Sequence, residues 1–582
     1  MINKTFTRSV LASAVSIALL GSYDALAKDV AFDPVELPVA ADTLTVSDSV
    51  TVNGKQQDIG FTELFRTGDT DDGETYGLMK DYNGDPAFAD DGVTPYICSG
   101  NTPGVEGSGT DNNAILQKNG KIYLISQFEC QTGGMYMAEL SQAKDGSLTP
   151  VPGTLKFIDQ SREWGGWVHC AGSVTPWNSY LGGEEYEPNA ANLVGYAAGD
   201  AGIDAAYDDK VRSYFLGDYS LPSPYQNGWI TEVDIKHGTP SFTKHYAMGR
   251  FSHELGYVMP DGKTAYLTDD GTNETLFMFV ADQPEDLSSG TLYAAYWDQT
   301  SAEDAGYANL KWINLGHANE ASVRAAIMDK TVFSDLFELD GTGCTSIKAN
   351  NVAECIKLKE GVDMAVASRL ESRRYAALLG ATHEFRKMEG FTFDPKRNRG
   401  YIAISDVAKG MLDGGAGEAT GNHIRIAQRD SCGAIYSLDM TSGVNDMDGN
   451  PINSGFVAVN MNTLLASGTD LGKEGAEQCA TQNGVMAQPD NITMLPNSDV
   501  LVIGEDGDHA NNMVWAYNLE SGDLTRIVTV PEGAETTSPY FHKVGKFNYM
   551  TLVAQHPDPS AGNPDGDTIT GYVGPMTLLG NN

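Results

Sequence analysis

Acidic residues recur in this chain at both ends of short hairpin-like segments, at a spacing that would let them share a metal ion. The acidic residues of three segments lie 16, 17 and 16 residues apart: Glu254 and Asp270, Glu389 and Asp406, and Asp490 and Asp506. Carboxylate oxygens are the ligands that Ca²⁺ prefers. One Asp after a strand is usually a turn residue, but recurrence at matched positions favours a shared functional ring.

Each acidic pair encloses the pattern of a β-hairpin. A polar residue precedes a short apolar strand, a turn with Gly, Pro, Asn or Asp, and a second apolar strand. Further copies begin at Asn112, Cys170 and Ser538, and strand-like segments such as 276–280 follow the hairpins. Six hairpins with added strands predict an all-β fold, a six-bladed β-propeller with helical and loop insertions covering one face. Its inner strands would line a central channel, with both ends of each hairpin at one mouth.

Carboxylates gathered at the mouth of a channel raise one another's pKa by repulsion, and a bound cation removes this penalty. Calcium is the first candidate for such oxygen ligands outside the cell. Cys170 opens one hairpin copy, so its thiolate could face the same channel. A thiolate is too soft for Ca²⁺ alone and would indicate iron, zinc or copper beside it. The alternative is a buried, inert thiol.

The cysteine count is odd. Seven cysteines in an oxidising compartment leave at least one unpaired. Plausible pairs are Cys98 with Cys130, Cys344 with Cys355, and Cys432 with Cys479. These pairings leave Cys170 as the free thiol.

The spacing between hairpins leaves room for insertions. Successive copies start between 48 residues (490 to 538) and 135 residues (254 to 389) apart, whereas a four-stranded blade takes about 40–50 residues. The largest excess, around residues 315–385, carries helical patterns at 319–328 and 362–379. It could cover the site and exclude water, or cap an outer blade. The acidic segment 67–74 could form a peripheral calcium loop or a solvated turn.

The N-terminus has the pattern of a secretory signal peptide. Lys4 and Arg8 precede an apolar run of about a dozen residues, which is too short to span a bilayer, and Ala-Leu-Ala at 25–27 is a small-residue cleavage site. We therefore divide the chain into a signal peptide, residues 1–27, and one catalytic propeller domain, residues 28–582. The predicted location is the periplasm or the extracellular space, with no membrane span elsewhere.

Composition excludes several classes of partner. The 582 residues include 78 Asp and Glu against 38 Lys and Arg, a formal net charge of −40. This balance argues against nucleic acid or anionic lipid as the main partner. Hydrophobic residues make up 41% of the chain, enough for a large core. The sequence has no Walker loop, dinucleotide fingerprint or nucleophile-elbow serine, and we expect a monomer that acts on a small molecule.

The repeats resemble those of the PhoX-type alkaline phosphatases. The most specific piece is Cys-Ala-Gly-Ser-Val-Thr-Pro-Trp at 170–177, followed by Leu-Gly-Gly-Glu-Glu at 181–185. Shorter matches follow in the family's order, at residues 249–254, 387–390, 489–491, 505–507 and 555–557. The resemblance spans about residues 110–560. It implies a six-bladed propeller whose axial iron–calcium cluster hydrolyses phosphomonoesters.

The resemblance also implies roles for individual residues. Cys170 would be an iron ligand, and the remaining iron and calcium ions would be held by Glu185, Glu254, Glu389, Asp490 and Asp506. Whether Glu184 or Glu185 faces inward is a question of register, and we choose Glu185. The family usually has Arg two residues before the Glu at position 389. Here Lys387 stands there with Arg386 beside it, and either could bind the substrate phosphate. The twin-arginine signal usual in the family is absent from residues 1–27.

The charge of the chain agrees with this chemistry. A phosphomonoester carries about two negative charges and would be repelled by a protein of charge −40 unless a cation cluster reverses the local field. We therefore predict a secreted alkaline phosphatase that uses calcium and iron to release inorganic phosphate from small phosphomonoesters. The alternatives are a calcium-dependent propeller phosphodiesterase or lactonase, and a non-catalytic binding propeller stabilised by calcium.

Overall fold

The structure is a computed structural model in which β-strands far outnumber helices. It describes residues 29–36, 42–89, 91–99, 107–192, 213–218, 220–419, 421, 423–467, 485–507, 509–558, 567–577 and 579. The all-β fold class is confirmed. The predicted signal peptide, residues 1–27, lies outside the described residues. Within them, no helix has the length and apolar character needed to cross a membrane.

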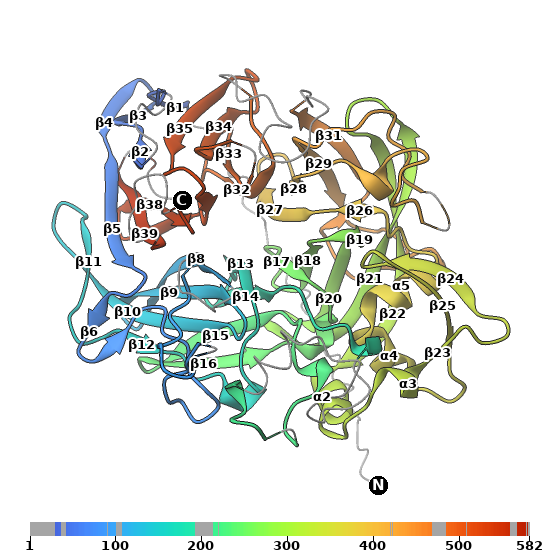
Figure 1. Ribbon diagram of the computed structural model, residues 1–582. Coiled ribbons are helices and arrows are strands. Elements are labelled where there is room, and N and C mark those ends of the chain that lie inside the picture. Colours follow the sequence, from blue (N-terminus) through green and yellow to red (C-terminus); the bar gives the residue numbers. More distant parts are fainter. Residues whose placement is uncertain are drawn as a thin grey trace, which may run out of the picture.

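Every predicted hairpin forms as an antiparallel pair of strands. The pairs are β8 (Gly107–Lys118) with β9 (Lys121–Cys130), β13 (His169–Val174) with β14 (Tyr180–Glu184), β17 (His253–Val258) with β18 (Thr264–Asp269), β27 (Met388–Asp394) with β28 (Arg399–Ile404), β32 (Pro489–Met494) with β33 (Val500–Glu505), and β37 (Phe541–Val544) with β38 (Phe547–Gln555). Figure 1 shows β8, β13, β17, β27 and β32 facing a common centre, with the rest of each sheet outside them.

Further strands extend each hairpin outward. They are β10 (Gly134–Gln142), β11 (Leu148–Pro150), β12 (Lys156–Phe157), β15 (Thr231–Lys236), β16 (Thr239–Lys244), β20 (Phe277–Gln283), β21 (Asp286–Ser301), β22 (Tyr307–Asn319), β29 (Ala434–Thr441), β30 (Val457–Ala458), β31 (Asn460–Ala466), β34 (Met513–Asn518), β35 (Leu524–Thr529) and β39 (Ile569–Met576). We interpret each stack as a propeller blade. The number of six blades stays a prediction, because β22 pairs with β31 and joins two stacks into one ten-stranded sheet.

The two ends of the described chain are joined within one sheet. Strand β5 (Gly60–Arg66) pairs with β39, and β36 (Glu535–Thr537) pairs with the end of β38. The small N-terminal strands are β1 (Val30–Phe32), β2 (Thr45–Val46), β3 (Ser49–Val52), β4 (Lys55–Asp58), β6 (Thr70–Asp71) and β7 (Glu74–Thr75). Because β5 and β39 come from opposite ends of the sequence, their pairing closes the circular arrangement of the sheets.

The segment predicted as a peripheral calcium loop or a solvated turn contains β6 and β7. The Asp71 carboxylate accepts hydrogen bonds from the amides of Gly153, Thr154 and Leu155 at 2.7–3.0 Å. These bonds lower the pKa of Asp71. Asp71 therefore anchors this turn to the loop that follows β11.

The predicted helices of the 315–385 insertion form, together with a small sheet that the sequence did not indicate. The elements are α2 (Glu320–Met328), α3 (Phe333–Leu336), β23 (Phe337–Leu339), β24 (Thr345–Ala349), β25 (Val352–Leu358), α4 (Met364–Leu370) and α5 (Ser372–Leu378). The segment 362–379 is two helices, because the chain leaves the helical conformation at Glu371. Asn319 and Asp363 cap α2 and α4 by accepting backbone N–H groups.

Two disulfides predicted from the sequence are present. Cys98 pairs with Cys130, and Cys344, just before β24, pairs with Cys355 of β25. Cys170 is buried and free. The third predicted pair involves Cys479, which lies outside the described residues.

The remaining short elements are a two-stranded pair and single 3₁₀ turns. They are β19 (Thr272–Glu274), which pairs with β26 (Phe385–Arg386), and single 3₁₀ turns at Ser161–Glu163, Ala190–Asn192, Pro224–Gln226, Tyr246–Met248 and Lys409–Met411. The β19–β26 pair links the third inner hairpin to the fourth, because β19 follows β18 and β26 precedes β27.

Apolar side chains pack between neighbouring stacks. The Tyr266 and Phe391 rings, for example, are stacked with their centroids 4.9 Å apart.

Glycines let neighbouring inner hairpins approach each other closely. A Cβ atom on Gly390 of β27 would lie 2.6 Å from the Asp490 carbonyl oxygen of β32. A Cβ atom on Gly183 of β14 would lie 2.2 Å from the His253 carbonyl oxygen of β17. Both contacts are with backbone, which cannot move aside as a side chain could. The close approach of neighbouring inner hairpins therefore depends on glycine at these two positions.

Gly390→Ala is expected to lower the free energy of unfolding by about 2 kcal/mol or more, because the added methyl overlaps the β32 backbone. Gly455→Ala is the control, since its Cβ would meet no atom within 4 Å. Urea unfolding of both variants measures the difference. Equal midpoints for Gly390→Ala and the wild type would contradict the close approach.

Candidate metal centre

A β-bulge recurs at the same place in five inner hairpins. The register between the two strands shifts by one residue within 169–172, 253–256, 388–391, 489–492 and 110–112. A bulge re-aims the side chain of its extra residue. The side chains at these bulges include Cys170, Glu254, Glu389, Asp490 and Asp111.

These side chains, together with Glu129 near the end of β9 and Glu185 just after β14, form three overlapping groups, which we call the acidic ring. The groups are Asp111, Glu129 and Cys170; Cys170, Glu185 and Glu254; and Glu254, Glu389 and Asp490. Within each group the ligand atoms lie within 4.8 Å of one another. The sulfur of Cys170 is 2.9 Å from Glu254 Oε2 and 3.9 Å from Asp111 Oδ2. Cys170 therefore lies inside the acidic ring rather than in an apolar core.

Lys387 is the cation placed against this ring. Its Nζ lies 3.1 Å from Glu389 Oε1 and 3.4 Å from Asp270 Oδ2. Burial alone would lower the pKa of Lys387, but Asp270 and Glu389 raise it well above its usual value. The same ammonium lowers the pKa of Asp270 in spite of its burial. The Tyr186 hydroxyl donates to Asp270 Oδ2 at 3.3 Å.

Arg386, the other candidate for binding phosphate, is engaged elsewhere. Its guanidinium pairs with Asp406 and donates to the Thr272 hydroxyl. Lys387 has a positive φ of 43°, whereas the two neighbouring residues form ordinary strand. This local turn sends the two adjacent side chains in different directions.

A second set of titratable groups forms the rim beside the ring. Asp506, predicted as a metal ligand, lies here with Glu535 as its neighbour and is outside the three groups described above. Burial and Glu535 raise the pKa of Asp506 to about 7. His556 Nε2 lies 2.6 Å from Glu535 Oε1. Although burial opposes the charge, Glu535 raises the pKa of His556 to about 10.

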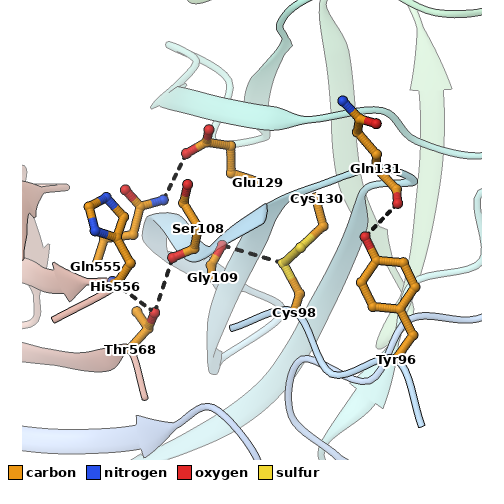
Figure 2. The surroundings of a disulfide bond; sticks show 10 residues. All are labelled: Tyr96, Cys98, Ser108, Gly109, Glu129, Cys130, Gln131, Gln555, His556 and Thr568. Carbon is orange, nitrogen blue, oxygen red and sulfur yellow. Dashed lines mark hydrogen bonds between the residues drawn. A yellow bond between two sulfur atoms is a disulfide. The ribbon is translucent and has the colours of Figure 1, made fainter. Parts of the chain in front are cut away.

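Figure 2 shows how one ring carboxylate is held at this rim. Glu129 Oε2 accepts a hydrogen bond from Gln555 Nε2 at 2.9 Å. Cys130 follows Glu129 directly, and its disulfide with Cys98 ties the end of β9 to the segment before β8. Burial raises the pKa of Glu129 to about 7. The disulfide thus fixes the backbone next to a ring residue.

The ring carries more negative charge than the described side chains neutralise. Burial, followed by repulsion from other ring acids, raises the pKa values of Asp111, Glu185, Glu254 and Asp490 well above normal. Burial raises the pKa of the Cys170 thiol in the same way, with Glu254 and Glu185 adding to it.

The donor set fits metal cations. Asp111 Oδ1 and Asp270 Oδ1 are buried without a hydrogen-bond partner among the described residues. Oxygen donors gathered around one sulfur suit hard cations together with a transition metal.

Adjacent acids at the ends of the second strands have different roles. Glu184 pairs with Lys244 at 2.8 Å, with both side chains fully buried, and accepts the backbone N–H groups of Gly228 and Trp229. Glu185, the next residue, lies in the ring. Of these two adjacent acids, Glu185 is therefore the one that lies in the ring, and its role as a metal ligand stays a prediction.

The same division holds at the other two acidic pairs. Asp269 binds Arg373 of α5, with Arg373 Nε 3.0 Å from Asp269 Oδ2, whereas Asp270 faces Lys387. Glu505 accepts the N–H groups of Ala487 and Met513, whereas Asp506 lies at the rim. One acid of each pair therefore makes structural contacts within the protein, and the adjacent acid lies at the site.

Sequence reasoning missed several residues of this site. Asp111 stands one residue before the position where the corresponding hairpin copy was taken to begin. Its bulge is equivalent to that of Cys170, so aligning the copies on their turns could have found it. Glu535 carries no sequence signal, because β36 is a separate short strand. Glu129 was recognised only as a hairpin end, Asp270 as an acid of the expected ring but not as a proposed metal ligand, and His556 only within a short family match.

Comparisons with known proteins give one family match and several similar solved structures. The chain matches the family model of alkaline phosphatase PhoX over residues 155–558. PhoX of Pseudomonas fluorescens, solved in complex with vanadate, a transition state analogue, is similar with a TM-score of 0.60 and 17% identity, covering 95% of this chain and 99% of that chain. Comparison with curated protein sequences gives no match.

Two other solved structures are more distant. The luciferin-regenerating enzyme has a TM-score of 0.32 and 9% identity, covering 80% of this chain and 92% of that chain. TolB from Acinetobacter baumannii has a TM-score of 0.25 and 8% identity, covering 81% and 65%. These scores are too low to support an argument about this chain.

The family match includes the inner hairpins that carry Cys170, Glu254, Glu389 and Asp490. The similarity to the Pseudomonas structure extends over nearly the whole of both chains. The resemblance noted from the sequence is therefore confirmed, and the chain belongs to the alkaline phosphatase PhoX family.

Proposed function

We propose that this protein is a secreted, metal-dependent alkaline phosphatase that hydrolyses small phosphomonoesters at an axial cluster of calcium and iron. The observation that carries the proposal is the buried acidic ring around Cys170, with Lys387 bound at its edge. A ring of this charge needs cations to be stable, and the same cations would attract a phosphate dianion. Membership of the PhoX family supports phosphate ester hydrolysis.

The ring offers distinct donor sets for the two kinds of metal. The Cys170 thiolate suits iron, together with the nearby carboxylates of Glu185 and Glu254. The all-oxygen group of Glu254, Glu389 and Asp490 suits calcium. Such ions, when bound, stabilise the charge of the transferring phosphoryl group and activate the nucleophile.

The protein's own cations would complete phosphate binding. Lys387 is held by Glu389 and Asp270 and is partly exposed, with 24% of its side chain accessible. When cations neutralise these two carboxylates, its ammonium group becomes free to bind a phosphoryl oxygen. Asp506 and His556 stand across the same rim, where the imidazolium held by Glu535 adds positive charge. Ring burial excludes water and strengthens these interactions.

Two features support a location outside the cytoplasm. The Cys98–Cys130 and Cys344–Cys355 disulfides are typical of an oxidising compartment. Residues 1–27 have the pattern of an export signal. We propose that residues 28–582 form a single catalytic domain, exported to the periplasm or the extracellular space, which acts as a monomer.

Metal analysis of the purified protein, combined with hydrolysis assays before and after EGTA, tests the proposal. We expect iron and calcium in the protein, hydrolysis of p-nitrophenyl phosphate, and loss of that activity in EGTA. A calcium-dependent diesterase would instead hydrolyse bis-p-nitrophenyl phosphate in preference, and a lactonase would open lactones. A binding propeller would contain calcium and have none of these activities. Protein without iron would contradict the proposed cluster.

Cys170→Ser is expected to lose iron and to lower monoesterase activity by about 100-fold or more, because a hydroxyl is a poor substitute for a thiolate ligand. Elemental analysis and p-nitrophenyl phosphate hydrolysis measure the two effects. The control is Ser173→Ala on the same strand, whose hydroxyl binds the Gly256 carbonyl. Full iron content in Cys170→Ser would rule out the thiolate as a ligand.

Lys387→Met is expected to reduce kcat/KM by about 100-fold, because an oriented cation is removed from the transferring phosphate. Metal content should be retained, since the substitution removes a competitor for the ring carboxylates. Arg386→Met should have a smaller effect, because Arg386 is bound to Asp406. Steady-state kinetics and elemental analysis distinguish the two, and equal losses would argue against a specific role for Lys387.

The metal-free protein is expected to become less stable as pH rises. Burial raises the pKa values of Glu129 and Asp506 to about 7 and of Glu389 to about 8. The folded state then retains protons that the unfolded state has lost, so stability falls from about pH 4.5 through about pH 8. Tm in EGTA should therefore be lower at pH 9 than at pH 6, and excess Ca²⁺ should remove most of the difference. An unchanged Tm in EGTA would mean that the ring charges are already compensated.

A further inference from the structure

The sixth inner hairpin has its register shift at a different position from the other five. Glu535 to Thr537 pair with Val553 to Gln555, and pairing resumes at Phe541 with Met550. Three residues, Ser538 to Tyr540, therefore stand opposite two. In this segment, Tyr540 lies next to the acidic ring. The other five hairpins have an acid or a cysteine at their register shifts.

The backbone of this segment is fixed by both neighbouring hairpins. The Ser538 hydroxyl donates to the Asp111 carbonyl oxygen at 3.0 Å, and the Ser538 N–H donates to Asn491 Oδ1 at 2.9 Å. Ser538 has a positive φ of 59°. Asp111 and Asn491 belong to the bulges on either side, so Tyr540 is held in register with the ring.

The Tyr540 hydroxyl faces the acidic ring without a partner. Its oxygen is fully buried and has no hydrogen bond among the described residues. Burial raises its pKa well above the usual value, and Asp490, Asp111, Glu254 and Cys170 raise it further. A phenol carries an O–H group, so a buried hydroxyl without a partner is available as a donor. An unpartnered buried hydroxyl is unfavourable, and a bound oxygen atom that accepts its hydrogen bond would remove this penalty.

The Tyr540 side chain also lines a cavity of about 210 Å³. Its lining includes residues that stand three positions beyond ring residues on the same strands: Ser173 after Cys170, Tyr257 after Glu254, Thr392 after Glu389, and Thr493 after Asp490. The cavity therefore lies further along the axis than the ring. Its walls mix polar side chains such as Asn113 and Thr493 with apolar ones such as Phe393 and Met494, and it has room for several water molecules.

We propose that Tyr540 closes the metal centre on its axial side, donating its hydroxyl hydrogen to an oxygen atom inside the ring and separating the ring from the cavity. The inference rests on the proposed function, since it concerns how the ring holds cations. Tyr540 is a positioning residue, because it acts on the oxygen ligands and not on the substrate. Partners of metal ligands commonly affect affinity by 10–100-fold.

The test compares Tyr540→Phe with Tyr257→Phe in the full-length protein as purified. Tyr257 lines the same cavity, but its hydroxyl interacts with Phe393 and Thr392. Calcium content is measured by elemental analysis in buffers of fixed free Ca²⁺, and calcium release into EGTA is followed over time. We expect Tyr540→Phe to need about tenfold more free Ca²⁺ for half occupancy and to release calcium faster. Tyr257→Phe should match the wild type.

The outcomes separate this inference from the proposed function. Wild-type occupancy and release in Tyr540→Phe would overturn the role of the hydroxyl, while leaving the phosphatase proposal intact. An equal loss of affinity in Tyr257→Phe would also overturn it, because the effect would then belong to the cavity as a whole. A wild-type protein without bound calcium would overturn the proposed function itself. Circular dichroism checks that both variants are folded, and Tyr540→Trp, which keeps a ring N–H donor, offers a second variant in which part of the affinity should return.

Discussion

The mutual repulsion of buried carboxylates at the axis is the constraint on which the rest of this structure depends. Asp111, Glu185, Glu254 and Asp490 are almost inaccessible to solvent, and burial, followed by repulsion from neighbouring acids, raises the pKa of each. Lys387 compensates only part of this charge. Such a site forms only if the sheets hold it in place and if protons or cations complete it. The close packing of the inner strands, the matched bulges and the β5–β39 pairing keep the acidic side chains in position.

The protein distinguishes between acids that it neutralises itself and acids that it leaves for ligands. Glu184 has Lys244 and two backbone amides, and Asp269 has Arg373 from the insertion. Each is followed in the sequence by an acid of the ring. The insertion therefore contributes to the site indirectly, because Arg373 also binds Glu187 and Glu274 beside it. The charge of −40 thus combines a large acidic surface with a small inward set whose charge the chain does not balance.

Much of the fold could be predicted because the relevant patterns are local. Hairpins are specified by apolar alternation and turn residues within about 17 residues, and helices α2 and α4 by periodicity and by Asn319 and Asp363. The Cys344–Cys355 disulfide closes a short loop. The small sheet of β23 to β25 was missed, because its strands are short and interrupted by polar residues. Asp111 was missed because a bulge shifts the residue that faces inward.

The sequence by itself determined the repeated hairpins, the acids at their ends, the free Cys170 and the family to which the chain belongs. Only the tertiary structure decided which of two adjacent acids faces the axis and that Lys387, not Arg386, meets the ring. It also placed Asp111 in the ring, with Glu535 and Tyr540 beside it. The physical reason is that successive side chains on a strand point to opposite faces. A one-residue bulge or a single positive φ reverses that choice, and the alternation of apolar residues does not show where either occurs.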